Sequence, residues 1–213
     1  MQREVSLKLM AVARDLIRVS PSLLFWQAYD AGCRADLSSC AHIVDGQIYL
    51  VDPIELNLAA VEELSLAGGA KMILLTNGNH ARAAVHFKER FKIPIFAHQD
   101  ARESLGIVLD GVLDESSQIS HDCQIIRLTG AGPGEIAIYQ AVSGVLSIGD
   151  ALINLPGLGF CPLPKKYCED CKEMRKSLGK LASMRVRAIT FAHGLPIVSD
   201  AEERLLQVIN NQL

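Results

Sequence analysis

Apolar residues change their spacing repeatedly along the chain, and these changes predict an alternation of short strands and helices. Residues 72–75 form an apolar run suited to one buried strand, and residues 76–79 form a polar break rich in Asn and Gly. From His80 the apolar residues recur at helical spacing until Pro94, which cannot continue a helix. The turn between them therefore joins the carboxyl end of a strand to the amino end of a helix, a common position for ligand sites.

Similar patterns predict elements on both sides of this unit. The segments 41–44 and 47–51 alternate around Asp45-Gly46, which predicts a hairpin. Residues 106–119 show only a weak pattern and are predicted to be mostly irregular, and the Gly- and Pro-rich segment 152–166 is predicted to be a loop. The other predicted strands are 11–19, 22–29, 94–97, 123–128, 135–142, 145–148 and 186–191, and the other predicted helices are 56–66, 99–105, 168–183 and 200–210.

The order of these elements predicts the fold class. Hairpins come first, then a strand–helix–strand unit, then further hairpins and a final strand and helix. Such an order suits an α/β (α+β) protein with two mixed sheets packed face to face and helices outside. A chain of 213 residues is long enough to bury a substantial core, and we expect one domain over residues 1–213.

Composition and charge narrow the classes of partner. Hydrophobic residues make up 49% and charged residues 21% of the chain, as in ordinary soluble proteins. The net charge of −3 gives no reason to expect nucleic acid or an anionic membrane surface as a partner. No apolar run approaches the roughly 20 residues that span a bilayer, and residues 1–13 lack the apolar core of a signal peptide. We therefore expect a cytoplasmic protein.

The six cysteines are predicted to be reduced. Cys168-x-x-Cys171 has metal-like spacing, but a structural zinc site needs four ligands and no second pair lies nearby. These two and Cys161 are therefore predicted to be ordinary thiols. The other three are predicted to be small core residues: Cys33, Cys40 and Cys123.

The central turn, Thr-Asn-Gly-Asn-His-Ala-Arg at 76–82, resembles the Thr-His-x-His-x-Asp-His turn of the metallo-β-lactamase superfamily, in the same strand-to-helix context. Three further segments resemble the superfamily's other motifs: the Gly-rich run 128–136, the apolar-Gly-Asp run 146–151 and the turn 190–194. The resemblance covers about residues 11 to 211. It implies the αββα four-layer sandwich of that superfamily.

The superfamily's motifs hold one or two metal ions, usually zinc. Of the seven matching ligand positions, Asp150 and His193 are kept, and the other five are replaced by Asn77, Asn79, Ala81, Arg82 and Ala131. A carboxamide is a poor zinc ligand and alanine offers none. The resemblance therefore implies a degenerate site that cannot hold two metal ions, and we expect no metal cofactor.

Arg82 suggests what replaces the metal. A guanidinium can supply the positive charge that a buried Asp150 requires. We predict an Arg82–Asp150 ion pair with Asn77, Asn79 and His193 hydrogen-bonded around it. The alternative is that Arg82 points to solvent.

His80 offers a second arrangement. With Asp150 and His193 it would form a His-His-Asp set sufficient for one Zn, Mn or Fe ion. It follows the superfamily's second His position by one residue and is predicted to lie on the first turn of the helix, where its direction differs. This favours a simple hydrogen bond to a neighbour over metal ligation.

Three functions follow in order of preference. The first is a non-hydrolytic pseudoenzyme, a binding or regulatory module that uses the helix start at His80 and the cation of Arg82 to hold a small anion. The second is an ester or thioester hydrolase with one metal at His80, Asp150 and His193. The third is metal-free acid–base catalysis by His193 oriented by Asp150. The sequence names no substrate, and it leaves a homo-oligomer open.

Overall fold

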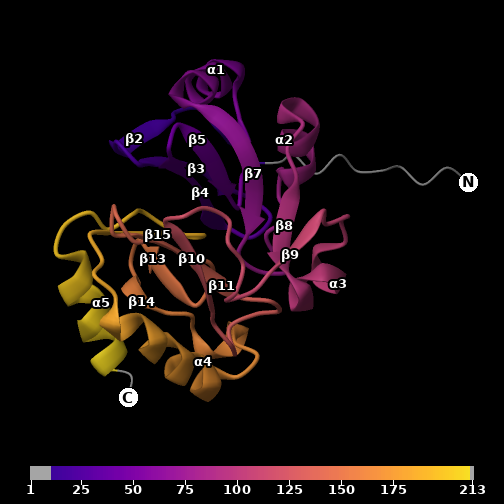
Figure 1. Cartoon of the computed structure of the whole chain (residues 1–213). Coiled ribbons are helices and arrows are strands. Elements are labelled where there is room, and N and C mark those ends of the chain that lie inside the picture. Colours follow the sequence, from indigo (N-terminus) through magenta and orange to yellow (C-terminus); the bar gives the residue numbers. More distant parts are fainter. Residues whose placement is uncertain (1–10, 212–213) are drawn as a thin grey trace, which may run out of the picture.

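The computed structural model describes residues 11–211, and these form two sheets packed face to face with helices on the outer faces (Figure 1). The larger sheet has the strand order β2-β3-β4-β5-β7-β8-β9. β2 to β5 are antiparallel neighbours, whereas β5, β7, β8 and β9 run parallel. The bounds are β2 Ile17–Ser20, β3 Leu23–Asp30, β4 Ala35–Val44, β5 Gln47–Val51, β7 Gly69–Leu75, β8 Ile95–His98 and β9 Gly111–Leu113.

The smaller sheet has the order β10-β11-β12-β15, and its last two strands are parallel. Two short pairs lie beside the main sheets, β1 with β6 and the hairpin of β13 with β14. The bounds are β10 Cys123–Arg127, β11 Ile136–Gln140, β12 Val145–Ile148, β15 Ala188–Phe191, β1 Val12–Ala13, β6 Glu55–Leu56, β13 Leu152–Leu155 and β14 Gly159–Pro162.

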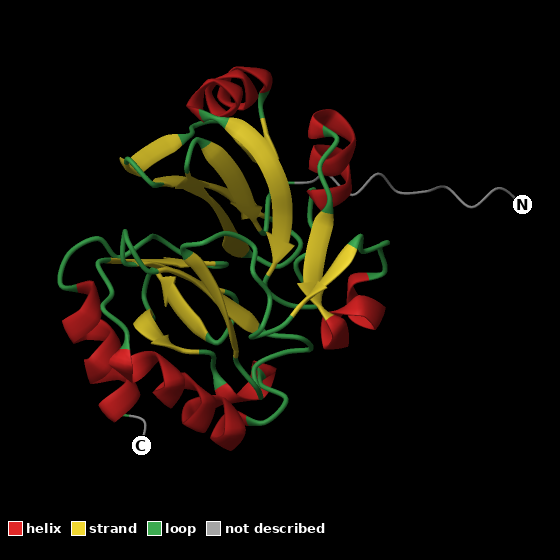
Figure 2. Cartoon of the chain, in the orientation of Figure 1, coloured by secondary structure: helices red, strands yellow, loops and turns green. Residues whose placement is uncertain are grey.

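Helices cover the outside of both sheets (Figure 2). α1 and α2 flank the larger sheet, and α4 and α5 flank the smaller one (Figure 1). The α-helices are α1 Leu58–Ala67, α2 Ala84–Phe91, α3 Arg102–Leu105, α4 Cys171–Leu178 and α5 Ala201–Asn210, and the 3₁₀ helices are Gln99–Ala101, Lys165–Tyr167 and Gly179–Ser183. This is the predicted αββα sandwich.

Alternation along the strands explains the layers, because successive side chains of a strand point to opposite faces. In β7, Ile73 and Leu75 pack beneath the helices, whereas Leu74 packs between the sheets. In β11, Tyr139 faces the core under α4 and α5, and Ile138 faces the other sheet. Each sheet is therefore apolar on both faces.

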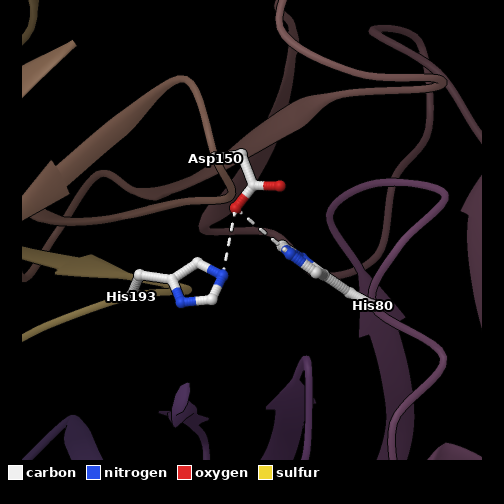
Figure 3. Close-up of side chains that lie close together, drawn as sticks. All are labelled: His80, Asp150 and His193. Atoms are coloured by element: carbon white, nitrogen blue, oxygen red, sulfur yellow. Dashed lines mark ion pairs between the residues drawn. The ribbon is translucent and has the colours of Figure 1, made fainter. Parts of the chain in front are cut away.

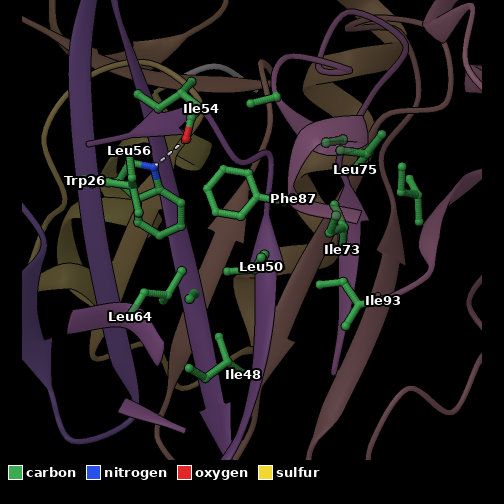
Figure 4. Packing of buried hydrophobic residues seen from close by; sticks show 14 of the residues in the cluster. Trp26, Ile48, Leu50, Ile54, Leu56, Leu64, Ile73, Leu75, Phe87 and Ile93 are labelled. Carbon is green, nitrogen blue, oxygen red and sulfur yellow. Dashed lines mark hydrogen bonds between the residues drawn. The ribbon is translucent and has the colours of Figure 1, made fainter. Parts of the chain in front are cut away.

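The core beneath α1 and α2 contains Trp26, the largest fully buried side chain of the described residues (Figure 4). Trp26 is fully buried among Leu64 of α1, Phe87 of α2 and the aliphatic residues of the sheet. Its indole N–H donates to the carbonyl oxygen of Ile54 at 3.0 Å, so its one polar group is satisfied. This bond ties β3 to the segment just before β6.

A polar cluster lies between the two sheets. His42 Nε2 is 2.6 Å from Ser147 Oγ, which is 2.7 Å from Thr190 Oγ1, and His42 Nδ1 is 3.3 Å from Gln140 Oε1. The Cys40 thiol joins the cluster at 3.2 Å from Ser147 Oγ. These groups satisfy one another in a layer that is otherwise apolar, as buried polar groups must.

Several predicted elements need correction. The segment 152–166 is not a loop, because it contains the hairpin of β13 and β14, and residues 106–119 contain β9. α2 begins at Ala84 rather than at His80, since Arg82 has a φ of +37°, which no α-helix residue adopts. Cys33 is exposed rather than buried, whereas Cys40 and Cys123 are buried as predicted.

The buried His42 predicts acid sensitivity. Burial lowers the pKa of His42 from 6.5 to about 4. Below about pH 6.5 the unfolded chain therefore binds a proton on His42, whereas the folded chain does so only near pH 4. The folded state loses stability relative to the unfolded state as the pH falls from about 6.5 to 4. We expect the free energy of unfolding to fall by about 2 kcal/mol between about pH 7 and pH 5 from this group alone.

Urea denaturation at both pH values measures this difference. The control is His42→Gln, which keeps a side chain able to hydrogen-bond but removes the titrating group. The fall with pH should be smaller in this variant by the same amount. An equal pH dependence in the two proteins would show that His42 is not responsible.

Candidate metal centre

The carboxyl ends of four strands from both sheets meet at one edge of the sandwich. Asp52 follows β5, Thr76 follows β7, Asp150 lies two residues after β12, and His193 lies two residues after β15. β5 and β7 are parallel neighbours, as are β12 and β15, so the residues after each pair emerge side by side. This topology gathers side chains that are more than a hundred residues apart in the sequence.

His80 lies at the centre of this edge and is 2% exposed. Its Nδ1 is 2.9 Å from Asp52 Oδ2 and 2.9 Å from Thr76 Oγ1. Asp52 also accepts the backbone N–H of Thr76 at 2.8 Å, so the carboxylate is itself held in place. These contacts fix the orientation of the imidazole ring and direct its Nε2 toward the opposite sheet.

Three donor atoms converge on the other side of His80 (Figure 3). Asp150 Oδ1 lies 3.3 Å from His80 Nε2 and 3.5 Å from His193 Nε2. The second histidine is also held from behind, because its Nδ1 is 3.1 Å from the carbonyl oxygen of Asp36. Among residues 11–211 these three form the one group of His, Cys, Asp or Glu residues able to share a metal ion.

The donor set fits a single metal ion. His80 Nε2 and Asp150 Oδ1 are buried 3.3 Å apart and neither makes a hydrogen bond, which is costly unless they share a proton or a cation. A tetrahedral zinc ion with ligands at about 2.0–2.1 Å has ligand–ligand edges of about 3.3 Å. The two separations at Asp150 are close to that length, and all three ligand atoms lie within 4.8 Å of one another. Metal-binding histidines also commonly direct their second nitrogen to a carboxylate or a backbone carbonyl, as both rings do here.

Without a metal ion, a proton on His80 can balance the negative charges of Asp52 and Asp150. Burial lowers the pKa of His80, but Asp52 and Asp150 outweigh it and raise the pKa to about 9. Burial likewise raises the pKa of Asp150, and His80 and His193 outweigh it and hold that pKa below its ordinary value. An imidazolium between two carboxylates is therefore the metal-free form of the site.

Arg82 does not form the predicted ion pair with Asp150. Its Nη1 donates to the carbonyl oxygens of Ser38 at 2.6 Å and Asp52 at 3.1 Å, and its Nη2 donates to that of Ala192 at 3.0 Å. The alternative, a side chain pointing to solvent, is also wrong. These oxygens belong to a residue within β4 and to residues that follow β5 and β15. Two of them accept a second hydrogen bond, that of Asp52 from Ser39 Oγ and that of Ala192 from the backbone N–H of Ser38.

The two asparagines of the turn differ. Asn77 is fully buried and its Nδ2 donates to Asp150 Oδ2 at 3.0 Å, as predicted, and to Glu135 Oε2 at 2.8 Å. Asn79 is exposed, and its backbone N–H donates to Asn77 Oδ1 at 2.8 Å. Neither side chain bonds Arg82. Of the two asparagines only Asn77 contacts Asp150 in the described hydrogen bonds, so the predicted network forms only in part.

Sequence reasoning missed the roles of Thr76 and Glu135 and left Asp52 without one. The position of Asp52 is a weak signal of a role. It stands between a buried strand and Pro53, and a carboxylate that is buried at such a place needs a partner. Glu135 follows a Gly-rich run, and nothing in the sequence separates it from a surface residue. Burial and the neighbouring Asp150 raise its pKa to about 8.

A cavity of about 510 Å³ opens onto this site. Asn79, His80, Asp150 and His193 are among the residues that line it. The lining also contains apolar side chains, among them Leu37, Ile54 and Ala83, and the charged side chains of Asp30, Glu55 and Arg82. The volume lies in the range of small-molecule sites.

The remaining predicted groups lie elsewhere. All six cysteines are free, and within the described residues Cys161, Cys168 and Cys171 contribute to no metal-ligand group. No helix of the described chain is long and apolar enough to cross a membrane.

Fold and site together define a sandwich protein with a His-Asp-His group that could hold a metal ion at the edge of its two sheets. The family model of the metallo-beta-lactamase superfamily matches residues 15–212. The chain therefore belongs to this superfamily. A probable metallo-hydrolase of Bacillus subtilis, YybB, is 28% identical over 181 residues, covering 75% of this chain and 82% of that protein.

Solved structures share the fold. The DIM-1 metallo-beta-lactamase superposes with a TM-score of 0.73 at 14% identity, covering 96% of this chain and 100% of that one. The FIM-1 metallo-beta-lactamase of Pseudomonas aeruginosa, in a mono-zinc form, superposes with a TM-score of 0.73 at 13% identity, covering 92% and 95%. At these identities the likeness concerns the fold alone.

The three carbonyl contacts of Arg82 predict a structural role. Arg82→Met removes a charged donor from three oxygens, and we expect the free energy of unfolding to fall by about 3 kcal/mol. Arg90→Ala, at an exposed arginine of α2, is the matched control and should change it by less than about 0.5 kcal/mol. Urea denaturation measures both, and equal effects would contradict the structural role.

Proposed function

We propose that the protein is a metal-dependent hydrolase of esters or thioesters that uses one ion held by His80, Asp150 and His193. The observation that carries this proposal is the convergence of three donor atoms, two of them buried without a hydrogen bond. The likeness to a probable metallo-hydrolase supports the same class of reaction. A bound Zn, Mn or Fe ion would polarise a carbonyl and generate hydroxide from water near neutral pH.

The chain's own residues prepare the site for that chemistry. Asp52 and Thr76 hold His80 with Nε2 toward the cavity, and the Asp36 carbonyl holds His193 in the same way. Ligands that are already held in place bind a metal without a further loss of side-chain conformational entropy.

The cavity provides the rest of the environment. Its apolar wall would exclude water from a bound acyl group, and the exposed carboxamide of Asn79 offers a donor and an acceptor to polar atoms of a substrate.

Metal content tests the proposal directly. Protein purified without chelator should contain about one equivalent of metal by elemental analysis. His80→Ala and His193→Ala should each lower this content severely, because each leaves only two protein ligands. His86→Ala is the control, since His86 is half-exposed, pairs with Glu55 and stands outside the donor set. Metal content that is unchanged in His80→Ala would reject this site.

One observation favours a second function, a metal-free binding module for a small anion. His80 can balance Asp52 and Asp150 with a proton alone, because the two carboxylates raise its pKa to about 9. In this case the site would be a pseudoenzyme without a cofactor, and Arg82 would use its remaining N–H groups for the anion.

Thermal unfolding distinguishes this module from the hydrolase. A metal-free protein should melt at a higher temperature with acetate or phosphate present, and Arg82→Ala should abolish that shift. A protein that gains stability from Zn²⁺ but not from these anions would exclude the module.

A further inference from the structure

Asp150 is held from two sides by a buried unit formed by Asn77 and Glu135. The carboxylate of Glu135 accepts the backbone N–H of Ala151 at 3.0 Å through Oε1. Through Oε2 it accepts from Asn77 Nδ2, which also donates to Asp150 Oδ2. Both the backbone after Asp150 and its side chain are therefore attached to Glu135.

The unit leaves the donor atom of Asp150 free. Asn77 engages Oδ2, so Oδ1 remains turned toward His80 and His193 and has no hydrogen bond of its own. Asn77 has no spare group, since its Oδ1 accepts the backbone N–H of Asn79. A carboxamide is needed here, because only a side chain with both a donor and an acceptor can make these contacts.

The backbone is shaped to admit the unit. A Cβ atom at Gly149 would lie 2.7 Å from Glu135 Oε1 and 2.6 Å from Thr76 Oγ1. Such contacts are too short for any side chain, so glycine at this position lets the segment before Asp150 approach Glu135 closely. Asn77 and Glu135 are both fully buried, which leaves them no solvent partner to replace these bonds.

We propose that Asn77 and Glu135 are positioning residues that fix the side chain of Asp150 as a ligand and thereby set the metal affinity of the site. This inference rests on the proposed metal-dependent function. It gives Asn77, which stands where the superfamily has a metal-binding histidine, a role that acts through Asp150 rather than on the metal. Positioning groups of this kind are typically worth 10–100-fold in metal affinity.

Titration with Co²⁺ against a competing chelator tests the inference. Asn77→Ala and the apolar Asn77→Leu, which keeps the branching of the side chain, should each weaken Co²⁺ binding by about 10–100-fold and change the visible absorption of bound Co²⁺. The matched control is Asn154→Ala. The side chain of Asn154 donates its Nδ2 to the carbonyl oxygen of Leu195 and contacts none of the three ligand side chains. Its backbone N–H donates to the carbonyl oxygen of His193 at 3.2 Å, a bond that the alanine variant keeps. It should bind Co²⁺ within about twofold of the unchanged protein.

The result that overturns the inference is wild-type Co²⁺ affinity and an unchanged spectrum in both Asn77 variants. Melting temperatures of the metal-free variants show whether each variant is folded, and Asn77→Leu leaves no cavity at this position. An Asn154→Ala variant weakened as much as the Asn77 variants would also overturn it.

Absence of metal binding by the unchanged protein would reject the proposed function instead. The contact between Asn77 and Asp150 is then tested by a double-mutant cycle on the metal-free protein. Asn77→Ala and Asp150→Asn together should lower the melting temperature by less than the sum of the single changes. Additive shifts would remove the positioning role as well.

Discussion

The site depends on the compensation of two buried carboxylates where the sheets end. Asp52 and Asp150 stand on opposite sides of the His80 ring, each close to one of its nitrogens. An unpaired buried carboxylate is costly, so the ring must carry a proton or share its Nε2 side with a cation. Either choice makes His80 the bridge between the carboxylates that follow β5 and β12.

Arg82 donates hydrogen bonds to backbone carbonyl oxygens, whereas His80 pairs with the carboxylates. Its three acceptors lie within β4 and directly after β5 and β15, which are strands of both sheets, and one of them, Ala192, is the neighbour of His193. A guanidinium offers several donors in a fixed plane, which suits this task better than a lysine would. Arg82, which the sequence suggested as the partner of Asp150, therefore joins the two sheets. The charge of Asp150 is compensated by His80 and His193 instead.

The predicted direction of the His80 side chain was wrong for a geometric reason, whereas the predicted hydrogen bond to a neighbour is present. His80 stands one residue after a superfamily ligand position and was predicted to lie on a helix. On a helix its side chain would point away from the site. The helix begins only at Ala84, and the irregular turn before it carries a left-handed Arg82. In such a turn the direction of a side chain does not follow from its spacing, so His80 can face the donor atoms of Asp150 and His193.

Local patterns in the sequence determined the layers, most element positions, and the presence of Asp150 and His193 at strand ends. These depend on period-two and helical spacing and on glycine- and proline-containing turns, which act between near neighbours. Only the tertiary structure decided the partners of His80, Arg82 and Glu135. Their contacts join residues 28 to 110 positions apart and arise from how two sheets are placed against each other. Such pairings depend on the packing of the whole chain, and no local pattern encodes them.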